Sequence, residues 1–194
     1  MILEVIKFGH PVLRQKGAQI ETISLETKQL VADMLETMYA AKGVGLAAQQ
    51  IGQALQVTVL DVSPITDRPS SIEVNGEPAE VNDHMPMVLI NPKIEPTGEM
   101  AAGGEGCLSF PEIFAEILRR EFVDVTAQNE KGETVKFRAG GLLSRAIQHE
   151  VDHLNGILFI DRMDKKTKEN LRPELEDLQA DTKENLKRKG NNNS

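Results

Sequence analysis

The sequence predicts an α+β fold in which antiparallel β-sheets pack around a central metal-binding helix, with a further helix near the C-terminal end. Apolar residues recur at helical spacing in residues 142–154, whereas several shorter segments between residues 56 and 137 are strand-like. The chain has 194 residues, 40% of them hydrophobic, and can therefore bury one substantial core. We expect one domain over residues 1–164, followed by a charged helix and disordered tail over residues 165–194.

The first predicted helix begins at about Leu25. Ser24 can act as its N-cap, because a serine oxygen accepts a hydrogen bond from the free N–H groups of a first turn. Gly43 is suited to ending the helix. One face carries apolar side chains at three-and-four spacing, namely Leu30, Val31, Met34, Leu35 and Met38.

Strands are expected in residues 56–62 and 87–90, and residues 122–127 should pair with residues 134–137 across a turn at Lys131 and Gly132. A proline-rich insertion occupies residues 63–86. It contains Asn75 followed by Gly76, which is a strong signal for a tight turn between two strands. We predict a small surface hairpin there, with His84 as an ordinary surface residue.

The central helix carries the most informative motif of the chain. Gly140 and Gly141 precede it and Gly156 follows it, and residues 149–153 read His-Glu-Val-Asp-His. Residues four apart lie on one helix face, so His149 and His153 can bind one metal ion with Glu150 beside it. The alternative is a pair of hydrogen-bonded core histidines. Their spacing around a glutamate favours metal-assisted hydrolysis.

Two imidazoles leave a metal ion short of a ligand, because a catalytic site usually has three protein ligands and one water. Downstream, Asp161 and Asp164 are candidates, but they follow an abrupt glycine break. Upstream, Cys107 is the only cysteine and lies in a glycine-rich segment. A lone cysteine is more often a small buried apolar residue. Here the missing ligand and the glycine-rich setting favour metal binding, and one Cys with two His and an open position would suit zinc.

Three blocks of the sequence together resemble the signature motifs of the peptide deformylase family. They are residues 43–50, 105–109 and 148–154, which read GVGLAAQQ, EGCLS and QHEVDHL in the family's order. The resemblance extends from about the N-terminus to residue 164, which would be the catalytic domain. It implies removal of the formyl group from the N-terminal formylmethionine of newly made proteins, with release of formate.

The resemblance also implies roles for single residues. Cys107, His149 and His153 would bind the metal, and Glu150 would act first as general base and then as general acid. The side-chain amide of Gln50 and the backbone N–H of Leu108 would form the oxyanion hole. We place the catalytic amide on Gln50 because Gln49 fills the variable position of its block.

The substrate would lie against two groups of residues. By similarity, Val44, Gly45 and Leu46 border the peptide, and Gly45 offers backbone hydrogen bonds. The methionine side chain would be surrounded by Val44, Leu142, Ala146 and the aliphatic stem of Arg145. Phe110 and Phe114 are either walls of the peptide channel or ordinary core and surface aromatics. Arg119 or Arg120 is expected to hold Asp152 behind the histidines.

The family resemblance suggests Fe²⁺ as the physiological ion, one per chain, with Ni²⁺, Co²⁺ or Zn²⁺ able to occupy the same ligands. The expected partners are N-formylmethionyl nascent polypeptides. A net charge of −8 argues against broad nucleic-acid affinity, and we expect no direct sequence-specific nucleic-acid binding. No segment is apolar enough to cross a membrane, no signal-peptide core is present, and the single cysteine fits a reducing compartment, so a cytoplasmic location is expected.

The end of the chain is highly charged, with a thin apolar stripe at Leu171, Leu175 and Leu178. Pro173 is compatible with either a helix start or a break. We expect a helix that frays into a disordered lysine-rich and asparagine-rich end. In some deformylases the C-terminal helix docks on the ribosome, but this tail mixes acids with its lysines, which favours a solvated helix.

Two other classes of protein would share some of these residues. A zinc metallopeptidase of the HExxH type would share His149, Glu150 and His153, but it would need a further downstream ligand. A metal-storing module would explain Cys107 and the histidines, but it would need neither Glu150 nor Gln50.

Overall fold

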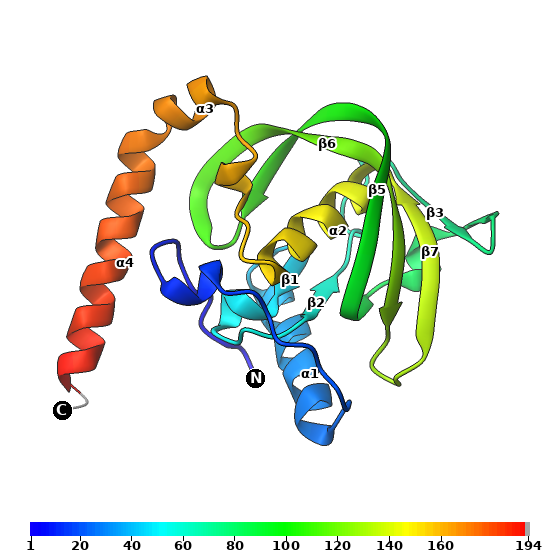
Figure 1. The fold of residues 1–194 in the computed structure, drawn as a ribbon, viewed down its shortest axis with the longest axis horizontal. Helices are drawn as coiled ribbons and strands as arrows, with labels where there is room; N and C mark the ends of the chain where they lie inside the picture. The colour runs from blue at the N-terminus through cyan, green and yellow to red at the C-terminus, as the bar shows by residue number, and fades with distance from the viewer. Residues whose placement is uncertain (193–194) are drawn as a thin grey trace.

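The computed structural model describes residues 1–192, and at its centre lies the helix α2 (Gly141–Leu154), which a curved antiparallel sheet surrounds (Figure 1). Seven strands are hydrogen-bonded in the order β1-β2-β5-β6-β7-β3-β4. The predicted α+β class is confirmed, with a single sheet containing all the strands. Their bounds are β1 (Gly45–Ala47), β2 (Val57–Leu60), β3 (Ser70–Val74), β4 (Glu77–Ala79), β5 (Met87–Cys107), β6 (Phe110–Gln128) and β7 (Thr134–Gly140).

Strands β5 and β6 form a long hairpin that bends over α2 (Figure 1). Their register shifts between Ile90 and Lys93, between Thr97 and Met100, and at the turn beside Cys107. Such irregularities bend a strand and increase its twist, which allows the hairpin to curve around the helix. The sequence predicted only the outer ends of this hairpin. The predicted pairing of β6 with β7 is confirmed, and Val125 lies opposite Phe137.

Helix α1 (Leu25–Ala40) begins as predicted, since the Ser24 hydroxyl accepts a hydrogen bond of 3.3 Å from the N–H of Thr27. Its end differs from the prediction. The left-handed residue is Lys42, with φ 55°, and the following Gly43 donates its N–H to the Met38 carbonyl at 2.9 Å. The apolar face of α1 packs on β1 and β2 in a cluster that includes Met34, Met38, Leu46, Val57 and Val59.

The predicted hairpin in the insertion is present as β3 and β4. Asn75 and Gly76 both have positive φ, 54° and 80°, as a two-residue hairpin turn requires. The hairpin is more than a surface feature, because Ile72 of β3 lies opposite Ala139 of β7 and is 2% exposed. Its addition extends the main sheet. His84 is exposed, as predicted.

The remaining helices flank this body. The short 3-10 helices are η1 (Pro11–Arg14), η2 (Ala48–Ile51), η3 (Val81–His84) and η4 (Phe159–Asp161). Helices α3 (Lys165–Asn170) and α4 (Arg172–Asn192) end the described chain, and Pro173 lies in the first turn of α4. Leu175 is buried with Val12 and Leu13 in the cluster beneath α4. None of the helices within residues 1–192 is long and apolar enough to cross a membrane.

The helix at the chain end extends further than predicted, because α4 continues to Asn192 through the lysine-rich segment that we expected to fray. Residues 193 and 194, the last of the expected disordered tail, lie outside the described residues.

Candidate active site

Helix α2 buries polar and charged side chains that a core helix would normally exclude. The predicted glycine boundaries are present, since Gly140 is the N-cap and Gly156, with φ 73°, follows the last turn. Every residue from Leu142 to Leu154 is buried, including His149, Glu150, Asp152 and His153. Burying such groups costs free energy unless each finds a partner. The partners of these side chains therefore indicate what the helix does.

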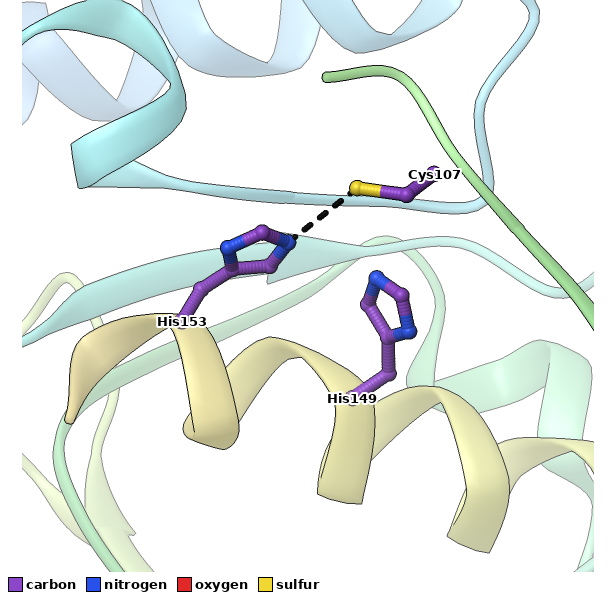
Figure 2. Close-up of side chains that lie close together, drawn as sticks. All are labelled: Cys107, His149 and His153. Atoms are coloured by element: carbon purple, nitrogen blue, oxygen red, sulfur yellow. Dashed lines mark hydrogen bonds between the residues drawn. The ribbon is translucent and has the colours of Figure 1, made fainter. Parts of the chain in front are cut away.

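Cys107 and the two histidines meet at one point. Cys107 ends β5, next to the two-residue turn Leu108–Ser109, and this turn holds its thiol over α2. The Cys107 Sγ lies 3.3 Å from Nε2 of His153, and the three candidate ligand atoms all lie within 4.8 Å of one another. Figure 2 shows the two rings rising from successive turns of α2 toward the sulfur. A thiolate with two imidazoles is a donor set that suits a late transition metal.

The downstream acids are already engaged elsewhere. Asp161 pairs with Arg14 and accepts the N–H of Leu158, whereas Asp164 caps α3 through Thr167. The third candidate ligand beside His149 and His153 is therefore the thiol of Cys107, and neither aspartate belongs to this group.

His149 is oriented by a buried carboxylate. Its Nδ1 lies 2.9 Å from Oε1 of Glu105, which leaves Nε2 as the ring nitrogen that could bind a metal together with Cys107 and His153. Glu105 also accepts hydrogen bonds of 2.7 and 2.9 Å from Arg119 and one of 2.8 Å from Arg145. Burial alone would raise the pKa of Glu105, but the hydrogen bonds from His149 and Arg119 outweigh it and hold this pKa well below its usual range. A charged Glu105 fixes the tautomer of His149 as Nδ1–H.

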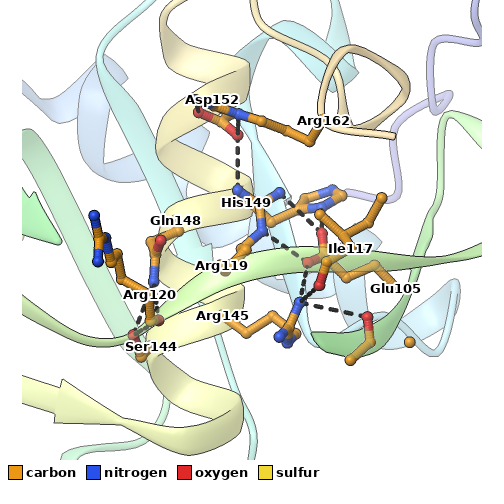
Figure 3. A network of polar contacts seen from close by, with 12 residues as sticks. Glu105, Ile117, Arg119, Arg120, Ser144, Arg145, Gln148, His149, Asp152 and Arg162 are labelled. Atoms are coloured by element: carbon orange, nitrogen blue, oxygen red, sulfur yellow. Dashed lines mark hydrogen bonds and ion pairs between the residues drawn. The ribbon is translucent and has the colours of Figure 1, made fainter. Parts of the chain in front are cut away.

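The second link of this network holds Asp152. Arg119 donates to Asp152 at 2.8 Å, and Arg162 donates to the same carboxylate at 2.8 and 3.2 Å (Figure 3). Of the two predicted arginines, Arg119 is therefore the partner of Asp152, and it is only 4% exposed. The neighbouring Arg120 is exposed and donates to the carbonyl of Gly98.

Sequence reasoning assigned no role to Glu105 or Arg162. Glu105 was recognisable, because it stands two residues before Cys107 in an extended segment, and alternate residues of a strand share a face. Arg162 carried no comparable signal, since it lies in an irregular segment after α2.

Glu150 faces the cavity beside the histidines. Burial raises the pKa of Glu150 to about 7, and its Oε2 is buried without a hydrogen-bond partner among the residues that the structure describes. Gly45 lies directly opposite, and a Cβ at this position would come within 2.4 Å of the Glu150 Oε1. The backbone of β1 therefore approaches the carboxylate as closely as only glycine allows.

The two glutamines after β1 point in different directions. The Gln50 amide nitrogen lies 3.2 Å from the Ser109 hydroxyl and 3.5 Å from the Cys107 sulfur, and its oxygen accepts the N–H of Ala47 at 2.9 Å. The Gln49 amide instead donates to the carbonyls of Gln15 and Leu154, at 3.3 Å each. Of these two amides, that of Gln50 therefore points toward Cys107, and that of Gln49 points away from it.

A cavity of about 650 Å³ adjoins Cys107, His149 and Glu150. All of the predicted substrate-binding residues line it except one, Leu46. Leu46 does not border the cavity, because its side chain is completely buried beneath α1, on the opposite face of β1 from Gly45. The guanidinium of Arg145 is bound to Glu105 and to the carbonyls of Ala101 and Ile117. The residues that line the cavity include Val44, Gly45, Gln50, Cys107, Leu108, Phe110, Phe114, Leu142, Arg145, Ala146, His149 and Glu150.

The chain matches the sequence model of one protein family, described as polypeptide deformylase, over residues 2–169. Among curated proteins, it is 46% identical over 178 residues to the peptide deformylase of Methylacidiphilum infernorum, covering 92% of this chain and 93% of that protein. It is 44% identical over 170 residues to the peptide deformylase of Opitutus terrae, covering 87% and 88%.

Solved structures give the same result. A plant peptide deformylase is similar with a TM-score of 0.81 and 35% identity, covering 94% of this chain and 92% of the plant chain. The peptide deformylase of Synechococcus elongatus, solved in complex with actinonin, is similar with a TM-score of 0.73 and 37% identity, covering 93% and 85%.

Proposed function

This chain belongs to the polypeptide deformylase family, and on that premise we propose that it hydrolyses the N-formyl group of formylmethionyl polypeptides with the help of one metal ion. The observation that carries the proposal is the meeting of Cys107 with His149 and His153 beside a buried Glu150, whose Oε2 has no hydrogen-bond partner within residues 1–192. The products would be formate and a polypeptide with a free amino terminus.

The metal would be held by Sγ of Cys107 and by one ring nitrogen each of His149 and His153. When bound at such a site, the ion makes water acidic enough to act as a nucleophile near neutral pH. The network around Glu105 and Asp152 supports this role, because it holds the Nδ1 side of His149 and the C-terminal half of α2 in place.

Glu150 would move the proton. Its pKa of about 7 suits a group that first accepts a proton from the attacking water and then donates it to the leaving amine. The closeness of Gly45 restricts the carboxylate to the side of the cavity that the reacting atoms would occupy.

Charge that develops on the formyl oxygen would be stabilised by two donors, the Gln50 amide and the backbone N–H of Leu108. Each such donor is worth about 3 to 4 kcal/mol in the transition state when it is preorganised. Support comes from the position of both residues at the lining of one cavity, next to Cys107.

The substrate's methionine side chain would lie against the apolar part of the cavity lining. Val44, Leu142 and Ala146 would provide its walls, together with the stem of Arg145. An unbranched thioether adapts well to such a slot. Gly45 would offer backbone hydrogen bonds to the peptide, and we propose that actinonin, found in the Synechococcus relative, binds this cavity too.

The resident ion is proposed to be Fe²⁺, with Ni²⁺, Co²⁺ or Zn²⁺ as substitutes. Ferrous iron beside a thiolate is open to oxidation. We therefore expect activity to decay in air for the iron-loaded protein and to persist for the nickel-loaded protein. Equal stability of both forms in air would count against iron.

The test is formate release from formyl-Met-Ala-Ser, measured with and without a chelator. We expect activity that the chelator abolishes, and no cleavage of casein. Glu150→Ala should retain the metal and lose turnover, whereas Glu176→Ala, on the exposed face of α4, should keep both. Full activity of Glu150→Ala would refute the proposed mechanism.

A zinc metallopeptidase is the less favoured alternative. The described residues supply the third ligand from upstream, as Cys107, and the two downstream aspartates are bound elsewhere. Casein cleavage that a chelator abolishes would favour it.

We further propose that the protein acts in the cytoplasm on nascent chains, and that residues 1–164 form the catalytic domain. The acidic first half of α4 opposes docking of this helix on the ribosome. Deletion of the chain after Ala180 would exclude such docking if ribosome co-sedimentation were unchanged.

A further inference from the structure

A short N-terminal segment, residues 6–8, lies beside the two residues of the proposed oxyanion hole, and its Lys7 also lines the cavity. The N–H of Ile6 donates to the carbonyl of Gln50 at 2.7 Å, and the N–H of Phe8 donates to the carbonyl of Ser109 at 2.9 Å. Between them, the ammonium of Lys7 donates to the carbonyl of Leu108 at 2.7 Å. One segment therefore contacts both residues that would supply the donors.

The segment is itself well anchored. The ring of Phe8 stacks on that of Phe110 with 4.8 Å between centroids, and Phe110 packs edge-on against Phe159 at 5.0 Å. Phe110 and Phe159 are each 1% exposed. Consequently, residues 6–8 form a fixed support on which the turn at Leu108 rests.

The turn needs such a support. Leu108 and Ser109 are the two residues that join β5 to β6, and the register of this hairpin shifts immediately before them. A carbonyl in a tight turn lies outside the ladder of strand hydrogen bonds and is free to tilt unless another group binds it. The Leu108 N–H belongs to the preceding peptide plane, which shares the Leu108 Cα with this carbonyl, so a displacement of that Cα would move the N–H as well.

We propose that Lys7 is a positioning residue, whose bond to the Leu108 carbonyl aligns the Leu108 N–H with the formyl oxygen in the transition state. The inference rests on the proposed function. Lys7 would act through Leu108. Donors in an oxyanion hole work only at about 2.7–3.1 Å from the position of the developing charge. A small rotation of the turn would therefore slow the reaction without weakening binding of the peptide.

The test compares Lys7→Met, which keeps the apolar stem, with Lys7→Arg, which restores a charged donor. Lys16→Met is the matched control, because Lys16 is exposed in the same part of the chain and does not line the cavity. For Lys7→Met we expect kcat for formyl-Met-Ala-Ser to fall roughly tenfold or more, less than the 10²–10³-fold that loss of a whole donor costs, with KM nearly unchanged. Lys7→Arg should recover most of the loss.

Two outcomes would contradict a positioning role of Lys7. Unchanged kcat in Lys7→Met would overturn the proposal, as would a loss that follows a lower melting temperature or lower metal content and is not rescued by arginine.

A second measurement separates this inference from the proposed function. The backbone amide signal of Leu108 in a ¹H–¹⁵N spectrum should shift or broaden in Lys7→Met and return in Lys7→Arg. If the native protein releases no formate, the proposed function fails, and the spectrum alone decides whether Lys7 fixes the turn. An unchanged Leu108 signal would show that it does not.

Discussion

Helices α2 and α4 both carry many charged or polar side chains, but they use them in opposite ways. In α2, every residue from Leu142 to Leu154 is buried, and partners on the surrounding strands bind most of its polar side chains. The Oε2 of Glu150 is an exception within residues 1–192. In α4, most side chains are exposed, and the helix is held mainly by Leu175 and its neighbours.

The difference shows how a charged residue should be interpreted. A charge on α4 keeps water contact and costs little wherever it stands. A charge on α2 has lost its water, and Arg145 and Asp152 are each retained with an ion-pair partner. Glu150 differs, because its Oε2 is buried without a hydrogen-bond partner among the described residues. Burial of a charged or polar side chain therefore marks the groups that build the site, and four predictions test that distinction.

The largest expected effect comes from removal of a buried partner. Arg119→Met would leave Glu105 and Asp152 without their shared cation, and we expect the free energy of unfolding to fall by about 3–5 kcal/mol. Urea unfolding measures this change. Arg188→Met on α4, which breaks the exposed pair with Glu184, should change almost nothing. An equal loss of unfolding free energy in Arg119→Met and Arg188→Met would show that burial does not distinguish the two arginines.

The next effect concerns catalysis. Gly45→Ala would press a Cβ against the Glu150 carboxylate and displace it, so we expect kcat to fall by about 10²-fold, as a misplacement of about 1 Å can cause. The matched change is Gly190→Ala on α4, where a Cβ would meet no atom of the described residues within 4 Å. Steady-state kinetics of both variants decide the matter, and normal turnover in Gly45→Ala would show that Glu150 has room to move.

A smaller difference is expected between apolar residues of the two helices. Leu143 on α2 is completely buried, whereas Leu175 on α4 is 6% exposed and lies at the edge of its cluster. We expect Leu143→Ala to lower the free energy of unfolding by about 4 kcal/mol and Leu175→Ala by about 2 kcal/mol. Thermal and urea unfolding test this order, and a reversed order would mean that α4 contributes more to the core than its exposure indicates.

The smallest effect should come from the exposed lysines of α4. Replacement of Lys183 and Lys187 by glutamine should change the free energy of unfolding by less than about 0.5 kcal/mol and leave formate release intact. A large loss in either measurement would show that this face of α4 contacts the body of the protein.

How far the sequence could predict the molecule depends on the range of the interaction. Helical spacing and the glycines around it were enough to place α2, and the four-residue separation of His149 and His153 was enough to predict that they share a face. The Asn75–Gly76 turn followed from local backbone preference. These features depend on residues close together in the chain.

Interactions between distant segments were harder to predict. The length of β5 was missed because its glycines and prolines form strands poorly, and here long-range pairing with β6 overrides that preference. Leu46 was placed beside the substrate because its block borders the site, yet strand alternation turns it into the core. The contact of Asp152 with Arg119 was predicted only as a choice between Arg119 and Arg120, and the role of Glu105 was missed, because these residues lie on separate elements that no spacing within one segment connects.

The contact between the two ends of the chain has a consequence for biosynthesis. Lys189 on α4 lies 2.8 Å from Glu4, 185 positions earlier, and the backbone at Gln179 packs against Gly9. Because a protein is synthesised from its N-terminus, residues near Glu4 and Gly9 are made long before the residues of α4 that contact them. Contacts over such separations form slowly. We therefore expect the N-terminal segment to reach its mature packing only after residue 189 has been made.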